Sequence, residues 1–187
     1  MRVVKAIVPA AGLSSRFGGP NKMLADWNGQ TLIRSTVAAI AKCGIEVIVV
    51  TGRDANEVAA QCKEAKCAFN PNFALGLGTS LSVGVKASGE CDGFLIALGD
   101  MPDIRTEVVE ELIAQFQTAE PGSIIAPVYA VEPDRVGHPI LFCSSYRSKL
   151  EALAGDEGAR SIIQHSLNRL IQIQVSGALH DFDNPAT

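Results

Sequence analysis

Short apolar runs rich in β-branched residues alternate with amphipathic stretches along the first two thirds of this chain. The runs Val3–Pro9, Glu46–Thr51 and Phe94–Leu98 predict buried strands, because parallel strands are covered on both faces and are hydrophobic almost throughout. The stretch Thr31–Cys43 carries apolar residues at helical spacing and predicts a helix. The alternation therefore predicts an α/β fold, with a parallel sheet and helices on both of its faces.

The remaining elements follow from the same two patterns. We predict helices over Ala55–Lys66, Thr79–Ala87, Thr106–Gln117, Ser145–Leu153 and Ala159–Ser166, and strands over Cys67–Asn70, Ser123–Tyr129, Pro139–Phe142 and Leu170–Val175. The alternation loosens after Glu120, but no linker separates the two parts. A chain of 187 residues fits one medium domain. We therefore expect a single domain over residues 1–187, in which the second part completes the same sheet.

Composition and charge exclude several classes of protein. The net charge is −4, from 16 basic and 20 acidic residues without a basic run, so we expect no nucleic-acid polymer as a partner. No apolar stretch approaches the ~20 residues of a membrane helix, so we expect no membrane partner either. The five cysteines are odd in number and form no Cys-x-x-Cys pair, which disfavours disulfides and zinc and favours a cytoplasmic location.

Three unusual loops each follow a predicted strand, at the edge where open α/β sheets bind ligands. They are Ala10–Gly19, Asn70–Gly78 and Gly99–Pro102. In the first, glycines let backbone N–H groups approach phosphate oxygens closely, and Arg16 and Lys22 supply positive charge. Neither the Walker spacing nor Gly-x-Gly-x-x-Gly is present, so without these two cations the loop would be an ordinary strand–helix turn.

The second loop ends in Gly78-Thr79-Ser80 at the start of a predicted helix. Backbone amides and hydroxyls at such a position suit a phosphate or a base. Equally, Thr79 and Ser80 can do no more than cap the helix.

The third loop places Asp100 directly after an apolar strand. A carboxylate at the mouth of a buried strand suits Mg²⁺, a hard cation that prefers oxygen ligands. The alternative is a helix cap, but Asp103 is better placed for that role, which leaves Asp100 for the metal. In the tail, Asp181 and Asp183 fall on one side of an extended segment, so Asp183 is a candidate second ligand; the alternative is a polar C-terminal turn.

Two later clusters also combine polar side chains with restricted backbone. Gly137-His138-Pro139 sets a histidine between two backbone-restricting residues, although a lone histidine is more often structural. Arg160 falls on the first turn of a predicted helix, where an anion can dock.

Together these pieces resemble the MobA-like nucleotidyltransferase family, and within it the molybdenum-cofactor cytidylyltransferase branch. The matching pieces span nearly the whole chain and occur in the family's order: Ala10-Ala11-Gly12-Leu13-Ser14-Ser15-Arg16-Phe17-Gly18, Lys22, Asn70-Pro71, Gly78-Thr79-Ser80, Gly99-Asp100-Met101-Pro102, Gly137-His138-Pro139, Gly155-Asp156-Glu157-Gly158-Ala159-Arg160 and Asp181-Phe182-Asp183-Asn184-Pro185. The resemblance implies a Rossmann-like three-layer α/β sandwich of the nucleotide-diphospho-sugar transferase type, with a mixed, mainly parallel sheet.

The resemblance also assigns roles to residues. It implies a nucleotide-binding part over about residues 1–120 and an acceptor-binding part over about 121–187. The implied nucleotide-binding residues are Ala10, Ala11, Gly12, Leu13, Ser14, Ser15, Arg16, Gly78 and Ser80, and the implied catalytic residues are Arg16, Lys22 and Asp100. Mg²⁺ would be held by Asp100 and Asp183. The acceptor would meet Gly137, His138, Pro139 and Arg160.

The implied reaction joins CTP to the phosphate of a molybdopterin-type acceptor and releases pyrophosphate. Ala11 favours CTP over GTP, because guanylyl-transferring members tend to carry glycine there. Lys22 follows Arg16 by one residue more than in the family, which makes Arg16 the firmer phosphate ligand. Asn184 replaces a threonine and leaves both tail carboxylates intact.

Other functions stay open at this point. They are a nucleotidyltransferase with a sugar phosphate or other small phosphate as acceptor, and a non-catalytic maturation factor that delivers cofactor to a molybdoenzyme partner. A third, an NAD-linked oxidoreductase, is disfavoured by the first turn, which lacks the dinucleotide-binding glycine spacing.

Overall fold

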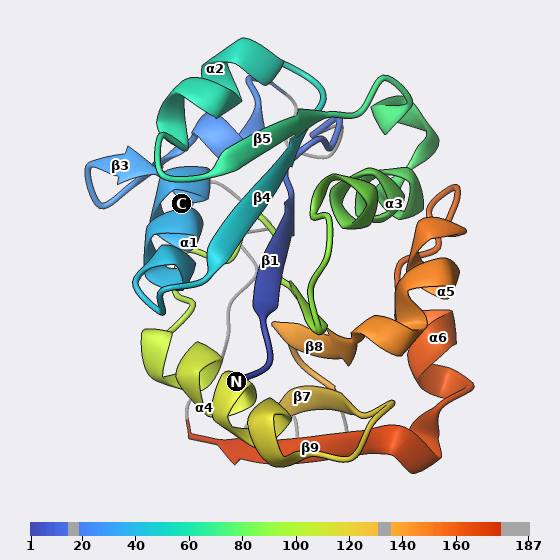
Figure 1. The fold of residues 1–187 in the computed structure, drawn as a ribbon. Coiled ribbons are helices and arrows are strands. Elements are labelled where there is room, and N and C mark those ends of the chain that lie inside the picture. The colour runs from blue at the N-terminus through green and yellow to red at the C-terminus, as the bar shows by residue number, and fades with distance from the viewer. Residues whose placement is uncertain (15–18, 131–135, 177–187) are drawn as a thin grey trace.

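A seven-stranded sheet runs through the centre of the computed structural model, which describes residues 1–14, 19–130 and 136–176 (Figure 1). The strand order is β5-β4-β1-β6-β8-β7-β9. The strands are β1 (Val4–Pro9), β4 (Glu46–Thr51), β5 (Lys66–Phe69), β6 (Gly93–Ile96), β7 (Ile124–Tyr129), β8 (Ile140–Cys143) and β9 (Leu170–Val175). Only β8 runs antiparallel to its neighbours in this sheet. The predicted mixed, mainly parallel sheet is confirmed.

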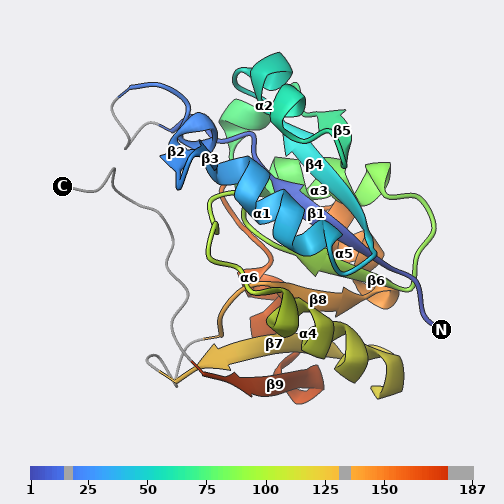
Figure 2. The same cartoon turned by 90° about the vertical axis from the view of Figure 1, so that its left-hand side faces the viewer.

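Helices cover both faces of the sheet and make it the middle of three layers (Figures 1 and 2). One face carries α1 (Leu32–Ala41), α2 (Ala55–Gln61) and α4 (Thr106–Thr118), and the other carries α3 (Leu77–Ala87), α5 (Arg147–Glu151) and α6 (Arg160–Gln164). The predicted three-layer α/β sandwich is therefore confirmed. Short 3-10 turns complete the described chain: η2 (Lys22–Leu24), η3 (Phe73–Leu75), η4 (Ser144–Tyr146) and η5 (Leu167–Arg169).

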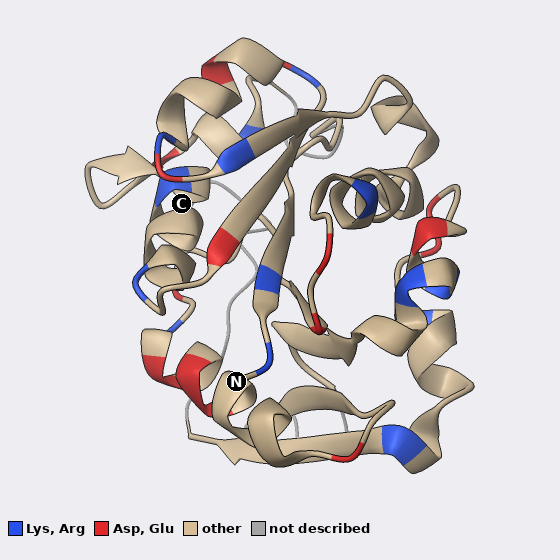
Figure 3. Cartoon of the chain, viewed as in Figure 1, with Lys and Arg blue, Asp and Glu red and all other residues tan. Residues whose placement is uncertain are grey.

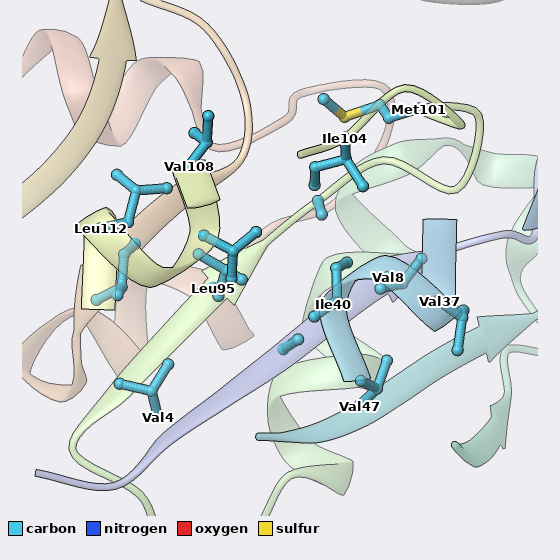
Figure 4. Packing of buried hydrophobic residues seen from close by; sticks show 14 of the residues in the cluster. Val4, Val8, Val37, Ile40, Val47, Leu95, Met101, Ile104, Val108 and Leu112 are labelled. Carbon is cyan, nitrogen blue, oxygen red and sulfur yellow. The ribbon is translucent and has the colours of Figure 1, made fainter. Parts of the chain in front are cut away.

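The apolar runs of β1, β4 and β6 are almost continuous because these central strands bury both of their faces. In β1, Val4 and Val8 point to the face of α1 and α4, whereas Ile7 points to the face of α3. Successive side chains of a strand alternate in this way, so a doubly covered strand has no polar face. Figure 4 shows the first of these two cores, in which strand residues Val4, Val8, Val47 and Leu95 lie with Val37 and Ile40 of α1 and Val108 and Leu112 of α4.

A small hairpin was not predicted. Strands β2 (Asp26–Trp27) and β3 (Gln30–Thr31) pair antiparallel across Asn28 and Gly29, whose φ angles are 51° and 82°. Positive φ at both central positions is typical of the tightest hairpin turn, and Asn-Gly is its strongest sequence signal. The hairpin was therefore visible in the sequence as a turn, although its strands are too short to show a pattern.

One predicted helix cap and one predicted helix start need correction. Helix α4 begins after Arg105 without a side-chain cap, so the predicted cap by Asp103 is wrong. The chain first makes a turn, in which the Ile104 amide donates to the Met101 carbonyl, and this turn delays the helix beyond the reach of Asp103. Helix α3 begins before Thr79, after Gly76, whose φ of 116° favours glycine.

Strand order brings the predicted loops to one edge. After β1 the chain continues to β4 on one side, whereas β6 lies on the other side of β1. The connections that leave β1 and β6 therefore run in opposite directions along the sheet. Such a switch point is where open α/β sheets bind ligands. Because β8 is reversed, its first residue, Ile140, pairs with Ile96 at the end of β6, and the segment before β8 reaches the same edge.

The described residues carry their charges at scattered positions (Figure 3). Figure 3 shows Lys and Arg residues scattered over the described ribbon rather than gathered on one face. Within the ranges that the structure describes, no helix is long and apolar enough to span a bilayer.

Candidate functional site

An ion pair joins the turn that follows the first loop to the third loop, across the switch point. The Lys22 Nζ lies 2.8 Å from the Asp100 Oδ2, and the two side chains are only 12% and 20% exposed. Lys22 begins η2, and its backbone amide donates to the Ser14 hydroxyl at 3.0 Å. The structure therefore brings together Lys22 and Asp100, which the sequence places 78 positions apart.

Gly99 sets the position of Asp100. The Gly99 amide donates to the Pro9 carbonyl, and the Gly99 carbonyl accepts from the Thr36 hydroxyl at 3.2 Å. A Cβ at Gly99 would lie 2.9 Å from both the Met23 sulfur and the Pro9 oxygen. Glycine therefore lets the end of β6 approach β1 closely enough for Asp100 to meet Lys22.

The first two residues of the first loop are buried. Ala10 and Ala11 are 1% and 2% exposed, and the Ala10 amide donates to the Val50 carbonyl of β4 at 2.8 Å. Gly12 and Leu13 are then exposed, and Ser14 has a positive φ of 53°. The candidate phosphate ligands Ser15 and Arg16 lie outside the described residues.

Sequence reasoning missed Arg53, which follows β4. Its guanidinium donates to the Leu13 carbonyl at 2.7 Å and to the Gly19 carbonyl at 3.2 Å. One side chain therefore holds both flanks of the first loop. No residue pattern signals this role, because the acceptors are main-chain oxygens.

Asn70 organises the second loop. It is fully buried, and its amide nitrogen donates to the hydroxyls of Thr79 and Ser80 at 2.9 and 3.0 Å. Its side-chain oxygen accepts from the Asn72 amide at 2.9 Å. The hydroxyl of Ser80, itself 4% exposed, therefore ties the loop to α3, and the sheet edge beside β5 is built around this asparagine.

Gly78 joins the second loop to the Gly155–Arg160 segment. Its amide donates to the Gly155 carbonyl at 2.9 Å. A Cβ at Gly78 would lie 2.7 Å from the carbonyl oxygens of Ala154 and Glu157. The predicted nucleotide and acceptor segments therefore touch through main-chain atoms.

A cavity of about 480 Å³ lies beside this contact, between α3, β6, β8 and α6. His138 and Arg160 both line it, among mostly apolar neighbours such as Leu81, Ile96 and Ile140. The Tyr129 hydroxyl donates to the His138 carbonyl at 2.7 Å, and the Tyr129 ring occupies the space that a Cβ at Gly137 would need. Buried Pro139 and half-buried Gly137 flank the histidine. Two of the predicted acceptor residues, His138 and Arg160, thus line one cavity.

The metal prediction is only partly covered by the structure. Among the described residues, no three His, Cys, Asp or Glu side chains gather as a metal site. Asp100 is the predicted ligand that is described, whereas Asp183, with its neighbour Asp181, lies outside the described residues. A half-buried carboxylate at a strand end fits Mg²⁺, which is commonly held by one or two carboxylates and by substrate phosphates.

Comparison with known proteins decides the family. The sequence model of the MobA-like NTP transferase domain matches residues 6–170. The chain belongs to this family. The resemblance seen in the sequence is thereby confirmed, and the chain is a nucleotidyltransferase of the MobA-like family.

Two curated relatives and one solved structure are similar to this chain. The nicotine blue oxidoreductase of Paenarthrobacter nicotinovorans is 28% identical over 86% of this chain and 81% of its own length. The molybdenum cofactor cytidylyltransferase of Escherichia coli (strain K12) is 30% identical over 75% of this chain and 70% of its own length. Rv0371c from Mycobacterium tuberculosis H37Rv superposes with a TM-score of 0.84 at 23% identity, covering 98% of this chain and 93% of that one, and shows the shared fold. That Mycobacterium protein has also been crystallised as a complex with manganese.

Proposed function

We propose that this chain is a cytoplasmic CTP:molybdopterin cytidylyltransferase. The observation that carries the proposal is the Lys22–Asp100 pair, which lies at the switch point beside a glycine-containing loop. A cation and a carboxylate there suit a metal-bound triphosphate. The relative from Escherichia coli, named a molybdenum cofactor cytidylyltransferase, supports the choice of acceptor, and Ala11 supports the choice of CTP.

The reaction requires no nucleophilic side chain, because a phosphate is the nucleophile. An acceptor phosphate oxygen attacks the α-phosphorus of CTP, a new P–O–P bond forms, and the bond to the β-phosphate breaks with release of pyrophosphate. The protein then contributes position and charge. Backbone amides of the first loop hold the triphosphate, and Lys22 and Arg16 compensate its negative charge.

Mg²⁺ is the proposed cofactor, held by Asp100 and Asp183. When bound, it would neutralise phosphate charge during the transfer. Asp100 suits this role because its backbone is fixed by Gly99, so the carboxylate is held at the mouth of the crevice. In the structure the ammonium group of Lys22 forms an ion pair with this carboxylate. Lys22 would therefore have to share the Asp100 carboxylate with a bound metal or move away from it.

The cavity beside α6 is the proposed place of the acceptor. Its walls are mostly apolar and suit the face of a flat ring system, and His138 and Arg160 supply polar contacts. Such a cavity, mostly apolar with few polar groups, has the usual character of a small-molecule site. Arg160 is exposed at the start of α6 and suits an anionic substituent.

The test is a pyrophosphate-release assay with each of the four NTPs, with and without molybdopterin and with Mg²⁺ or Mn²⁺. We expect release with CTP only when molybdopterin is present, and loss of activity with EDTA. Release with CTP and a sugar phosphate, but not with molybdopterin, would contradict the acceptor and support the first alternative.

Asp100→Asn tests the catalytic carboxylate. Asparagine has the same shape but no charge, so the protein should stay folded by circular dichroism while turnover falls at least about 100-fold, as for loss of one strong electrostatic group. Asp103→Asn is the matched control, because Asp103 is an exposed carboxylate three residues away without a capping role. Near-normal turnover of Asp100→Asn would refute the assignment.

A second candidate comes from the relative named an oxidoreductase, which matches more of this chain than the cytidylyltransferase does. Oxidation of NADH or NADPH with a redox dye, measured beside pyrophosphate release, separates the two activities. Nucleotide binding without either activity would instead favour a maturation factor that serves a molybdoenzyme partner.

A further inference from the structure

We propose that Arg53 is a positioning residue, which shapes the first loop for the triphosphate without touching it. The inference rests on the proposed function, since it assumes that this loop binds a nucleotide. Arg53 lies on the loop after β4, and its guanidinium contacts main-chain oxygens of the first loop.

The two acceptors lie on opposite sides of the loop. Leu13 lies in its first half and Gly19 is its last residue, and one guanidinium binds the carbonyls of both, at 2.7 and 3.2 Å. The sequence separation of Arg53 from them is 40 and 34 residues, so the contact depends on the folded sheet. Arg53 therefore acts as a clasp, by which we mean that its guanidinium bridges Leu13 and Gly19 and fixes the distance between them.

The clasp also fixes the direction of an amide. In a planar trans peptide the N–H points opposite to the preceding C=O. Because the Leu13 carbonyl faces Arg53, the Ser14 N–H faces away from it. Ser14 has φ of 53°, and left-handed residues in short loops help to turn successive N–H groups towards an anion. By binding the Leu13 carbonyl, Arg53 therefore directs the Ser14 amide away from itself.

Arg53 is itself well supported. Its Nε lies 3.3 Å from the Asp54 Oδ2, and its carbonyl accepts from the Asn21 amide group at 3.1 Å. Asn21 is 2% exposed and also caps η2, the turn that begins with Lys22. At Gly52, just before Arg53, a Cβ would lie 2.6 Å from the Phe73 side chain. The backbone that presents the guanidinium is thus held from both sides.

Arginine suits this role better than lysine does. Its planar fork offers five N–H donors in a fixed geometry and binds two acceptors at once, whereas an ammonium is a single point charge. Asp54 balances the charge of Arg53, so the group adds little net attraction for a triphosphate. We therefore expect its effect to come through loop shape.

Calorimetric titration with CTP, combined with steady-state kinetics, tests the proposal. For Arg53→Met we expect the Kd of CTP to rise about 10-fold, as for loss of one charge-assisted hydrogen bond. We expect kcat at saturating CTP to stay within about twofold of the wild type, because the reacting groups are intact. Arg53→Lys should fall between the two proteins.

Arg2→Met is the matched control. The Arg2 guanidinium also donates to two main-chain carbonyls, those of Phe116 and Ala119, but at the end of α4. We expect it to lower Tm without changing the Kd of CTP.

Unchanged CTP affinity in Arg53→Met would overturn the proposal, and so would a loss of kcat as large as the rise in Kd. An equal loss of affinity in Arg2→Met would also overturn it, because the effect would then be general destabilisation. If the wild type itself binds no NTP, the proposed function fails instead, so the two failures are distinguishable.

Discussion

Gly78→Ala tests the main-chain contact between α3 and the segment before α6. The added Cβ would lie 2.7 Å from the carbonyl oxygens of Ala154 and Glu157, where such a contact is ordinarily 3.4 Å or longer. Both obstacles are backbone atoms, so neither can rotate away. To relieve the overlap, the segment must move and stretch the 2.9 Å hydrogen bond from the Gly78 amide to the Gly155 carbonyl.

The expected cost combines two terms. Overpacking a close contact costs about 1 to 3 kcal/mol, and weakening a hydrogen bond adds about 0.5 to 1.5 kcal/mol. We therefore expect Gly78→Ala to lower the free energy of unfolding by about 3 kcal/mol. For a chain of this size that lowers Tm by roughly 6 to 12 °C, measured by scanning calorimetry. Because the displaced segment leads into α6, we also expect the acceptor KM to rise.

Gly158→Ala is the control from the same contact. Its Cβ would lie 3.3 Å from a methyl carbon at the tip of the Leu77 side chain, which can shift. We expect a cost below about 1 kcal/mol. Equal Tm values for the two variants would refute the reasoning, because they would show that the Ala154–Glu157 backbone moves at no cost.

Three other outcomes follow from contacts described for the site and from the cysteines. Lys22→Met removes the cation beside the proposed metal ligand, so Mn²⁺ binding without nucleotide, measured by electron paramagnetic resonance, should tighten about 3- to 10-fold; weaker Mn²⁺ binding would contradict this. Tyr129→Phe removes the hydroxyl that donates to the His138 carbonyl, which should cost about 1 kcal/mol in chemical denaturation and raise KM for the acceptor but not for CTP. Burial raises the pKa of the Cys62 thiol to about 12, whereas at Cys143 burial opposes hydrogen bonds from neighbouring serines and backbone amides, which prevail and lower the pKa. Since thiolate forms as pH rises through the pKa, iodoacetamide followed by mass spectrometry should label Cys143 at lower pH than Cys62; the reverse order would count against these pKa directions.

The fold was predictable because burial on both faces leaves a simple pattern. Val47–Val50 is apolar at every position, and the structure buries all four in β4. The pattern of apolar residues does not show in which direction a strand runs. The residues of β8 are equally apolar whether the strand runs parallel or antiparallel, so the place of His138 beside the end of β6 was not deducible from them.

The candidate site was predictable only where side chains carry the chemistry. Asp100 and Lys22 were chosen for charge and position, and the structure pairs them, although their roles stay predictions. Arg53 was missed because its partners are carbonyl oxygens, which every residue has. The cap predicted for Asp103 failed because a backbone turn, not a side chain, sets the start of α4.

Because β8 runs in the reverse direction, sequence changes near the proposed acceptor site and changes in the proposed nucleotide loops fall in different segments of the chain. The loops proposed to bind the nucleotide follow β1, β5 and β6, whereas His138 precedes β8 and lies next to them only through strand pairing. We therefore expect substitutions between β7 and β8 to reshape the proposed acceptor side while the hydrogen bonds of the first loop stay as they are. To redesign the choice of acceptor, residues 130–139 are therefore the segment to exchange with the corresponding residues of a relative.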